Sequence, residues 1–443
     1  RAAPAAITFT EDCVCRLRGT QVVGDRDCWV VDFEPAVEVT PDKSLYQGTV
    51  WIDRETYAWV KSRTLQLGLR GDAVSNDETI FFSPVDADGR PAAWGGDSFV
   101  LPLRTVGQQV YSLLNAAIVV ERERTLSDVR INAPDFEARR AEVLASEATM
   151  LRDTDDGMRY LVVDKETGER VIEETPDPTR LFALGGVFYD EALDFPLPLG
   201  GVNWLSFDFK GTGGQANVFF AGLLALVDIA TPSIGGSRWE AGADLFVLAV
   251  EGTDTLYVDG REANDQDVSV MQPNVDLTLG RNIGNYFKIQ AEYSLSWARY
   301  DDADDTADDF VIPTDHLNHL ITLRLNYNRG GYRLRLAGAY DVRSEWDAWG
   351  FPDNPDFDPG KDDFFLWDAG IAKTWYLPNF IQLGAEVEYV GGEDLDRFSK
   401  YQFGPFSDVE VRGYRSSLVR AEEALVTHLR YGFNLGEVFQ LNG

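Results

Sequence analysis

Residues 287–298 read FKIQAEYSLSWA, and along them the apolar residues Phe, Ile, Ala, Tyr, Leu and Trp alternate with Lys, Gln, Glu and Ser. A period of two predicts a β-strand with one apolar and one polar face. The same alternation recurs in residues 321–328, 332–337 and 381–389. These stretches run to about ten residues, the length of a membrane-crossing strand, whereas strands of soluble sheets have roughly 5–6.

Two further patterns favour a transmembrane antiparallel β-barrel over a soluble β-sandwich, whose strands also alternate. Short connections such as residues 328–331 are interspersed with long acidic ones such as 301–309 and 341–363, as in barrels with short periplasmic turns and long external loops. Aromatic residues also gather near strand ends, where a membrane interface is expected. They are Trp297, Tyr300, Trp346, Trp349, Trp367, Trp375 and Tyr376.

The bulk composition narrows the classes of function. The net charge of −33 argues against a nucleic-acid partner, because such a protein must present a basic face to phosphates. The longest apolar run, residues 218–227, is about half the roughly 20 residues of a transmembrane helix. We therefore expect the chain to cross a membrane with strands.

The sequence divides into three expected parts. Residues 1–137 contain consecutive short β-rich segments that predict a curved antiparallel half-barrel, and residues 181–443 form the expected barrel. Between them, residues 138–180 are expected to form a helix and a linker. The helix is predicted over residues 136–153, because FEARRAEVLASEATMLRD is rich in helix formers. The fold class is thus all-β with one helix.

The three cysteines lie near the N-terminus. Cys13 and Cys15 share one face of a strand, and Cys28 lies just beyond an expected hairpin turn at residues 22–25. Three thiols without a fourth ligand do not indicate a zinc site. A disulfide from Cys28 to Cys13 or Cys15 is one alternative in an oxidising compartment, and three unpaired thiols are the other.

Val411, Arg412, Gly413 and Tyr414 read VRGY, and one more alternating segment, residues 425–431, comes after them. This resembles the V-R-G-F/Y motif of the outer-membrane assembly and two-partner-secretion superfamily, the surface-antigen barrels that include BamA, TamA and FhaC. The resemblance implies that the motif lies on an external loop folded into the lumen. There the arginine would pair with an acid of the inner wall, because a guanidinium in a low-dielectric lumen needs a carboxylate.

The chain departs from that superfamily on the C-terminal side of the motif. The strand that should carry the acidic partner of Arg412 is missing, so either the sequence is a fragment or the barrel is smaller. In the first case we expect Arg412 in the lumen, against Glu386, Glu388 or water. In the second case we expect the loop outside the lumen, with Arg412 solvated.

The N-terminal part departs as well, because the helix pairs of POTRA modules are absent from its pattern. Residues 44–53 (SLYQGTVWID) and 94–103 (WGGDSFVLPL) instead resemble the LolA-like half-barrels of periplasmic lipoprotein carriers. That resemblance implies an apolar concavity for acyl chains. The residues expected to line it are Val50, Ile52, Leu65, Leu67 and Phe81.

Catalytic and metal motifs are not evident, and we predict that the chain is not an enzyme and needs no cofactor. G-x-S-x-G, P-loop, H-E-x-x-H and dinucleotide-binding patterns are all lacking. His316 and His319, three residues apart in a strand, would face opposite ways, so we expect no metal site and interpret both as solvated loop residues.

These patterns lead to one principal functional hypothesis and two alternatives. The principal one is a barrel of the assembly and secretion superfamily in the bacterial outer membrane. It would insert or translocate a lipoprotein or unfolded barrel client that its periplasmic N-terminal domain hands over. The alternatives are a lipid or lipoprotein carrier domain tethered to a passive barrel, and a structural surface protein. The expected partners are outer-membrane lipids, the client and additional envelope proteins.

Overall fold

The computed structural model describes residues 13–39, 45–69, 71–154, 157–165, 167–172, 178–188, 196–353, 361–377, 381–404, 408–411, 419–435 and 439–442. The chain divides into two compact units, residues 1–112 with 117–176 and residues 113–116 with 177–443. Strands dominate both units, and nearly all strand pairs are antiparallel. No helix among the described residues has the length and apolar character needed to cross a membrane.

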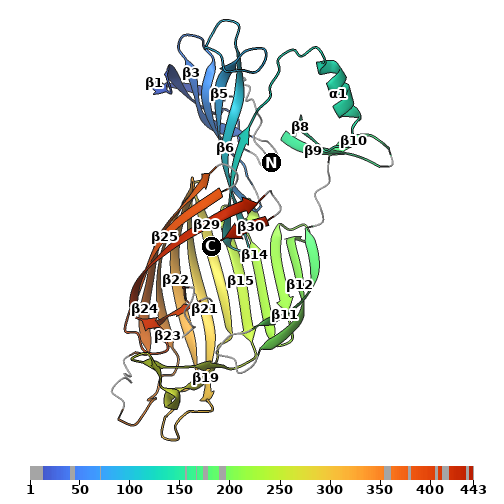
Figure 1. The fold of residues 1–443 in the computed structure, drawn as a ribbon. Coiled ribbons are helices and arrows are strands. Elements are labelled where there is room, and N and C mark those ends of the chain that lie inside the picture. The colour runs from blue at the N-terminus through green and yellow to red at the C-terminus, as the bar shows by residue number, and fades with distance from the viewer. Residues whose placement is uncertain are drawn as a thin grey trace. The chain divides into compact units, whose positions relative to one another are not determined.

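The first unit contains a seven-stranded sheet in which each strand pairs with the next one along the chain (Figure 1). Val23 pairs with Arg26 across a two-residue turn in which Gly24 has a φ of 63°, a conformation that glycine adopts readily. The strands are β1 (Cys13–Val23), β2 (Arg26–Pro35), β3 (Tyr46–Asp53), β4 (Trp59–Gln66), β5 (Ala73–Val85), β6 (Phe99–Leu113) and β7 (Ala116–Thr125).

The buried residues of this sheet are apolar in one part, with Val30, Trp51 and Val60 in a cluster, and polar in another. Asn76 donates to Gln66 (2.9 Å) and accepts from Gln109 (3.2 Å), so amide groups on three neighbouring strands satisfy one another. Glu78, whose side chain is 1% exposed, accepts hydrogen bonds from Arg122 and Arg124. The polar part is stable only because its polar groups are paired, since an unpaired buried group is costly.

The helix is shorter than the sequence predicts. Helix α1 spans Phe136–Ala145 and ends at Ser146, which has extended backbone angles. The next residues form β8 (Met150–Thr154), which pairs with β9 (Gly157–Val163), and β9 pairs with β10 (Arg170–Ile172). The prediction of helix over residues 146–153 is therefore wrong, because strand pairing in this part outweighs the helix propensity of Glu, Ala and Leu.

The second unit is a curved antiparallel sheet whose main path holds β11 to β15, β20 to β25, β29 and β30 in chain order (Figure 1). These strands are β11 (Thr179–Phe188), β12 (Leu197–Phe209), β13 (Gly214–Phe220), β14 (Leu224–Thr231), β15 (Trp239–Leu248), β20 (Asn274–Ile283), β21 (Phe287–Asp302), β22 (His316–Arg329), β23 (Tyr332–Arg343), β24 (Asp363–Leu377), β25 (Ile381–Glu393), β29 (Glu423–Leu435) and β30 (Phe439–Asn442).

Alternation along these strands separates two faces. In β22, Leu323 is 61% exposed, whereas its neighbour Thr322 is buried on the other face. The apolar side chains therefore form the outer surface of the curved sheet and the polar ones line its inner surface. The predicted all-β architecture, a half-barrel-like sheet followed by an antiparallel barrel wall, is confirmed as a fold class.

Short elements lie within the connections of the second unit. They are η1 (Ile234–Gly236), β16 (Gly252–Asp254), β17 (Tyr257–Val258), β18 (Arg261–Glu262), η2 (Asn264–Gln266), β19 (Val268–Met271), β26 (Tyr401–Gly404), β27 (Val409–Glu410) and β28 (Arg420–Ala421). Most of them occur at one end of the wall, and β19 joins β16 to the end of β21 there.

Candidate functional site

Four long connections leave the same end of the barrel wall. They are residues 249–273, 303–315, 344–362 and 394–422, whereas the opposite end has short turns at 284–286 and 330–331. Antiparallel strands reverse direction at each connection, so every second connection lies at the same end. We call the described residues of these four connections, with the strand ends that they contact, the loop cluster.

A buried ion pair anchors the 394–422 connection to the wall. Arg343, the last residue of β23, donates from Nη1 to Asp396 Oδ2 (2.6 Å) and from Nη2 to Oδ1 (3.1 Å). Both side chains are less than 5% exposed. The Arg343 guanidinium also lies 3.9 Å from the ring centre of Trp346. Two parallel charge-assisted hydrogen bonds give this pair a defined geometry as well as strength.

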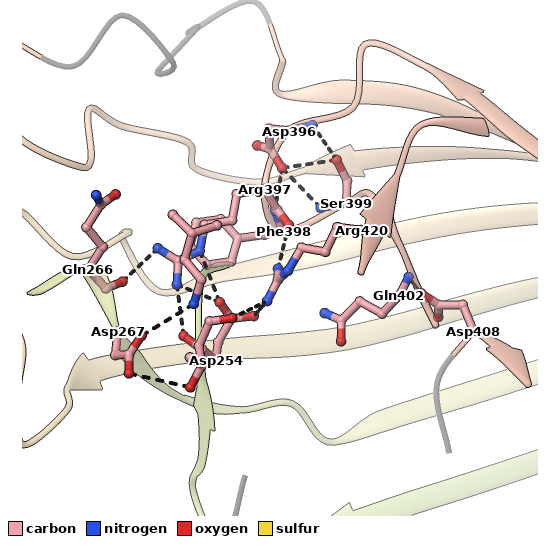
Figure 2. Close-up of polar contacts among 12 residues, drawn as sticks. Asp254, Gln266, Asp267, Asp396, Arg397, Phe398, Ser399, Gln402, Asp408 and Arg420 are labelled. Atoms are coloured by element: carbon pink, nitrogen blue, oxygen red, sulfur yellow. Dashed lines mark hydrogen bonds and ion pairs between the residues drawn. The ribbon is translucent and has the colours of Figure 1, made fainter. Parts of the chain in front are cut away.

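Next to it, one carboxylate holds two arginines (Figure 2). Arg397 donates from Nη2 and Nε to Asp254 Oδ1 at 2.7 and 3.0 Å, and Arg420 donates from Nη2 to Oδ2 at 2.6 Å. Arg397 also donates to the Gln266 carbonyl (2.7 Å). These contacts join the 249–273 and 394–422 connections at buried positions.

Asp254, Arg397 and Arg420 each depend on the other two, because their charges are largely removed from water. Burial lowers the pKa of Arg397, and the adjacent Asp254 carboxylate acts against that change. The side chains of Arg397, Arg420 and Asp254 are 6%, 8% and 12% exposed, so water screens the two guanidinium groups poorly. A desolvated charge that loses its partner destabilises the fold strongly.

An aromatic core packs beneath the ion pairs. Trp349 and Phe398 have ring centres 5.1 Å apart, and Tyr300 and Phe398 have theirs 5.3 Å apart. The buried members of this core are Val268, Ala298, Tyr300, Phe310, Trp346 and Trp349. Trp346, Trp349 and Tyr300 were expected at a membrane interface, and that expectation is wrong for these three. Loop packing buries them, so each is at most 9% exposed.

His316 belongs to the same core. It is 4% exposed and stacks on Tyr300 with ring centres 5.7 Å apart, so it is not the solvated loop residue that the sequence suggested. His319, three residues along β22, accepts or donates a hydrogen bond with the Tyr293 hydroxyl (2.8 Å). The two histidines therefore have separate surroundings, and within the described residues no group of three metal-binding side chains occurs.

The inner face of the wall carries a second set of ion pairs. Arg335 contacts both Asp368 (2.6 Å) and Glu388, and Arg430 donates to Glu386 (2.6 Å). Near the short turn at 284–286, Lys288 pairs with Glu240, which is fully buried. A Cβ on Gly280 would lie 2.5 Å from the Glu240 carboxylate, so a bare glycine makes room for this acid.

The VRGY motif falls mostly outside the described residues. Arg412, Gly413 and Tyr414 lie there, and the position of the Arg412 side chain stays a prediction. Val411 is described, and its backbone N–H donates to the Gly404 carbonyl (3.1 Å). The two acids suggested for Arg412 already have partners, because Arg430 contacts Glu386 and Arg335 contacts Glu388.

The residues expected to form an apolar ligand face do not share one face. Val50 pairs with Ser62, whereas Phe81 pairs with Lys61, and successive residues of β4 point to opposite sides. Leu65 lies on the same side as Phe81. Ile52 is half-buried beside a register shift, and Leu67 lies just beyond the end of β4. Binding of an acyl chain by this unit remains a prediction.

The strand register also excludes a disulfide to Cys28. Cys28 lies opposite Gln21, whereas Cys15 lies opposite Phe33, five residues further along β2. That offset is roughly 16 Å, while bridged cysteines have Cα atoms within about 7 Å. Cys13 lies further away still, and all three thiols are free.

Sequence reasoning missed the residues of the loop cluster. Asp254 and Arg420 are 166 residues apart, and Arg343 and Asp396 are 53 apart. Charged residues are abundant in this chain, so no spacing marks these particular ones. The adjacency of Asp396 and Arg397 beside an aromatic residue is the one local signal, and it is a weak one.

Comparison with known proteins found similar solved structures of outer-membrane proteins and nothing else. No family model matches it, and no curated protein matches it. BamA from Haemophilus ducreyi lacking POTRA domains 1–3 has 10% identity and a TM-score of 0.37, covering 71% of this chain and 64% of that chain. In-vitro folded OmpT, an outer membrane protein of Vibrio cholerae, has 10% identity and a TM-score of 0.25, covering 96% and 98%. The chain thus spans under two thirds of that BamA chain, and TM-scores this low carry no argument about fold or function.

The prediction that the chain is not an enzyme is wrong as a general exclusion. The structures that resemble it include several of OmpT as well as BamA. Fold does not determine activity, so the missing sequence motifs are not sufficient grounds to deny one. We withdraw the exclusion and assign no reaction in its place.

Proposed function

We propose that the second unit resides in the outer membrane as a β-barrel, with its apolar outer face in the hydrocarbon region. The observation that supports this is the extent of exposed aliphatic surface on neighbouring strands. Soluble monomers rarely expose contiguous apolar patches above a few hundred Å², whereas a lipid-facing wall requires them. The exposed residues include Leu277, Leu279, Ile289, Ile321, Leu323, Leu334, Ile371, Leu383, Leu425 and Leu429.

The inner face agrees with this orientation. Arg324 pairs with Glu292 and Arg335 with Asp368, both on the side opposite the aliphatic residues. Charges placed on the lipid side would be expensive, whereas paired charges on a wetted inner face are tolerated. The inner wall therefore has the character of a lumen.

Within such a barrel, the loop cluster argues against a passive pore. Asp254, Arg397 and Arg420 tie together connections that arise from widely separated strands, and Arg343 ties them to the wall. An open diffusion channel does not require its external loops to be held together, whereas here buried ion pairs fix them to one another. We infer that the loops close or narrow that end of the barrel.

We therefore propose a function of the assembly and secretion kind, in which the barrel wall acts on a client polypeptide. The N-terminal part, proposed as residues 1–137 and located in the periplasm, would present the client. The 138–180 segment would connect it to the barrel at 181–443. A lipoprotein or unfolded barrel protein is the client class that this proposal favours, with lipids and other envelope proteins as neighbours.

The alternative of an acyl carrier receives less support from the N-terminal sheet. Its buried apolar residues, such as Val30 and Val60, already pack on one another, and Gln66, Asn76 and Glu78 are hydrogen-bonded to other polar groups. An acyl chain gains binding energy from apolar contacts and offers no hydrogen bonds. If it displaced the partners of these polar groups, the groups would be left buried and unpaired. We therefore favour a polypeptide as the group that this unit handles.

Photo-crosslinking in the full-length protein tests this proposal. Strand β11 ends the main sheet path and, among the described strands, pairs with β12. A photoreactive residue at Leu184 of β11 should capture client polypeptide, whereas one at Leu323, in the middle of the wall, should not. Both positions are exposed, at 50% and 61%.

Membrane residence is measured on the same samples. The protein should fractionate with outer membranes and migrate faster on gels when unheated than when boiled. Recovery as a detergent-free soluble monomer would refute the barrel location. Equal crosslinking at Leu184 and Leu323 would instead leave the barrel in place and refute the client role.

A further inference from the structure

Basic side chains lie over aromatic rings repeatedly at the short-turn end of the wall, opposite the loop cluster. We call this end the short-turn rim. The pairs, with the distance from the charged group to the ring centre, are Lys210 over Phe209 (5.1 Å), Arg281 over Trp239 (5.1 Å), Arg329 over Tyr286 (4.8 Å) and Lys373 over Tyr332 (4.0 Å). Tyrosine and tryptophan are enriched where barrels meet headgroups, and cations there attract phosphates.

One of these pairs stands beside a groove on the outer face. The groove has a volume of about 420 Å³, which falls within the range of small-molecule sites. It is lined by Tyr286, Phe287, Leu325, Tyr327, Arg329, Leu334 and Leu336. Arg329 is therefore its single charged residue, and the remainder of the lining is aromatic or aliphatic.

The strand register arranges this lining in tiers. Arg329 pairs with Tyr332 at the rim, Tyr327 pairs with Leu334 in the next tier, and Leu325 pairs with Leu336 beyond it. Successive tiers on one face are roughly 7 Å apart. The surface thus changes from cationic to aromatic to aliphatic along the strand, the same order in which a phospholipid presents phosphate, glycerol and acyl chain.

The charge of Arg329 is not used within the described residues. On the inner face, Arg324, Arg335 and Arg430 each contact a carboxylate. Arg329 and Arg281 form no ion pair among the described residues, although the chain carries 73 acidic residues. An exposed arginine stacked on a ring retains its hydrogen-bond donors for an anion.

We propose that this groove binds one anionic phospholipid of the adjoining leaflet, with its phosphate at Arg329 and an acyl chain along Leu334 and Leu336. The inference rests on the proposed membrane residence of the wall and adds a ligand class and a site to it. The lipid source is favoured over free phosphate because six of the seven lining residues are aromatic or aliphatic.

Native mass spectrometry of the full-length protein in detergent tests the site. Dioctanoyl phosphatidylglycerol is titrated against dioctanoyl phosphatidylcholine, and the bound lipids are counted. Arg329→Gln should weaken phosphatidylglycerol binding about fivefold, since one basic side chain near an anionic lipid surface contributes about 1 kcal/mol. Binding of phosphatidylcholine should change little.

Two matched variants separate the site from general charge effects. Arg261→Gln removes another exposed arginine, one at the loop end, and should leave phosphatidylglycerol binding unchanged. Leu336→Trp fills the groove and should weaken binding of both lipids. Excess inorganic phosphate should not displace the lipid, and displacement would assign the site to a free anion and overturn the proposal.

The outcomes also separate this inference from the proposed function. If all variants show heat-modifiable migration but Arg329→Gln and Arg261→Gln bind phosphatidylglycerol equally, the lipid site is refuted and the barrel stands. If even the unaltered protein shows no heat-modifiable migration, the membrane location fails and the lipid site fails with it.

Discussion

The two large sheets of this chain follow the same alternating pattern but differ in where their apolar side chains lie: the first sheet buries Val30 and Val60 beside its polar residues, whereas the wall of the second unit exposes its aliphatic residues. In the first unit, Asn76 and Glu78 are less than 5% exposed, in a face where side chains hydrogen-bond one another. In the second unit, Leu323 and Leu429 are 61% and 78% exposed. Alternation determines which residues share a face, but the surroundings determine which face is buried. The comparison shows that a polar interior and an apolar exterior can arise from one simple period.

The largest effect on stability is expected in the loop cluster of the second unit. Asp254→Ala would leave Arg397 and Arg420 buried without their carboxylate, at a cost of about 3–5 kcal/mol. We expect the long connections to become protease-sensitive and the ion conductance of the reconstituted barrel to rise. Asp304→Asn, an exposed acid of the 303–315 connection, is the control. Unchanged proteolysis of Asp254→Ala would show that the ion pairs do not hold the loops.

The exposed apolar face provides the next test. Leu323→Arg places a charge in mid-wall and should cost about 2–4 kcal/mol if that face meets lipid. Arg324→Leu, its neighbour on the inner face, removes a partly buried pair with Glu292 and should cost less, about 1 kcal/mol, because water in the lumen can solvate the remaining carboxylate. Urea unfolding of the folded barrel, followed by its gel migration, measures both. Equal losses of unfolding free energy in the two variants would show that the outer face is not more apolar in its surroundings than the inner face.

The polar interior of the first unit should respond less strongly. Glu78→Gln keeps the shape but weakens the contacts with Arg122 and Arg124, which are partly exposed and can be rehydrated. We expect a loss of about 1–3 kcal/mol in the opening free energy of the β4–β5 pair. Hydrogen exchange of the full-length protein measures it. Glu123→Gln, in an exposed pair with Arg104, is the control and should change little.

The smallest effect is a pH dependence of the β2–β3 pair. Arg26, with help from Thr56, holds the pKa of the buried Asp53 well below its usual value. The folded state therefore gains stability from the ionised carboxylate above the usual aspartate pKa of about 4, and loses it as pH falls toward the lowered value. Hydrogen exchange near Cys28 should rise between about pH 5 and pH 2 beyond the intrinsic change. Asp53→Asn should abolish that excess, and an unchanged excess would assign it to another group.

Much of the secondary structure could be predicted from local pattern. The strands at residues 287–298, 321–328 and 381–389 fall within β21, β22 and β25. Gly24 marks the first hairpin, because its positive φ suits a two-residue turn. The prediction fails where helix propensity and strand pairing disagree. Residues 146–153 are rich in helix formers, yet strand β8 begins at Met150.

The candidate site could not be predicted in the same way. Trp346 and Trp349 are of the residue type that forms aromatic girdles at membrane interfaces. They are instead buried with Phe398 in the loop cluster. Glu386 and Glu388 were plausible partners for a distant arginine, yet neighbouring strands already supply Arg430 and Arg335. Nothing local distinguishes a tryptophan that meets lipid from one that packs under a loop.

The sequence by itself determined the period of each strand, the side chains that share a face and the turns that reverse the chain, because these depend on residues a few positions apart. The tertiary structure decided which of many acids meets which arginine, because Asp254, Arg397 and Arg420 come together only after the curved sheet has brought distant connections to one end. It also decided that Cys28 lies far from Cys15 and that Val50 and Phe81 face opposite sides. Register, set by pairing between strands, is the physical quantity that a single strand's sequence does not contain.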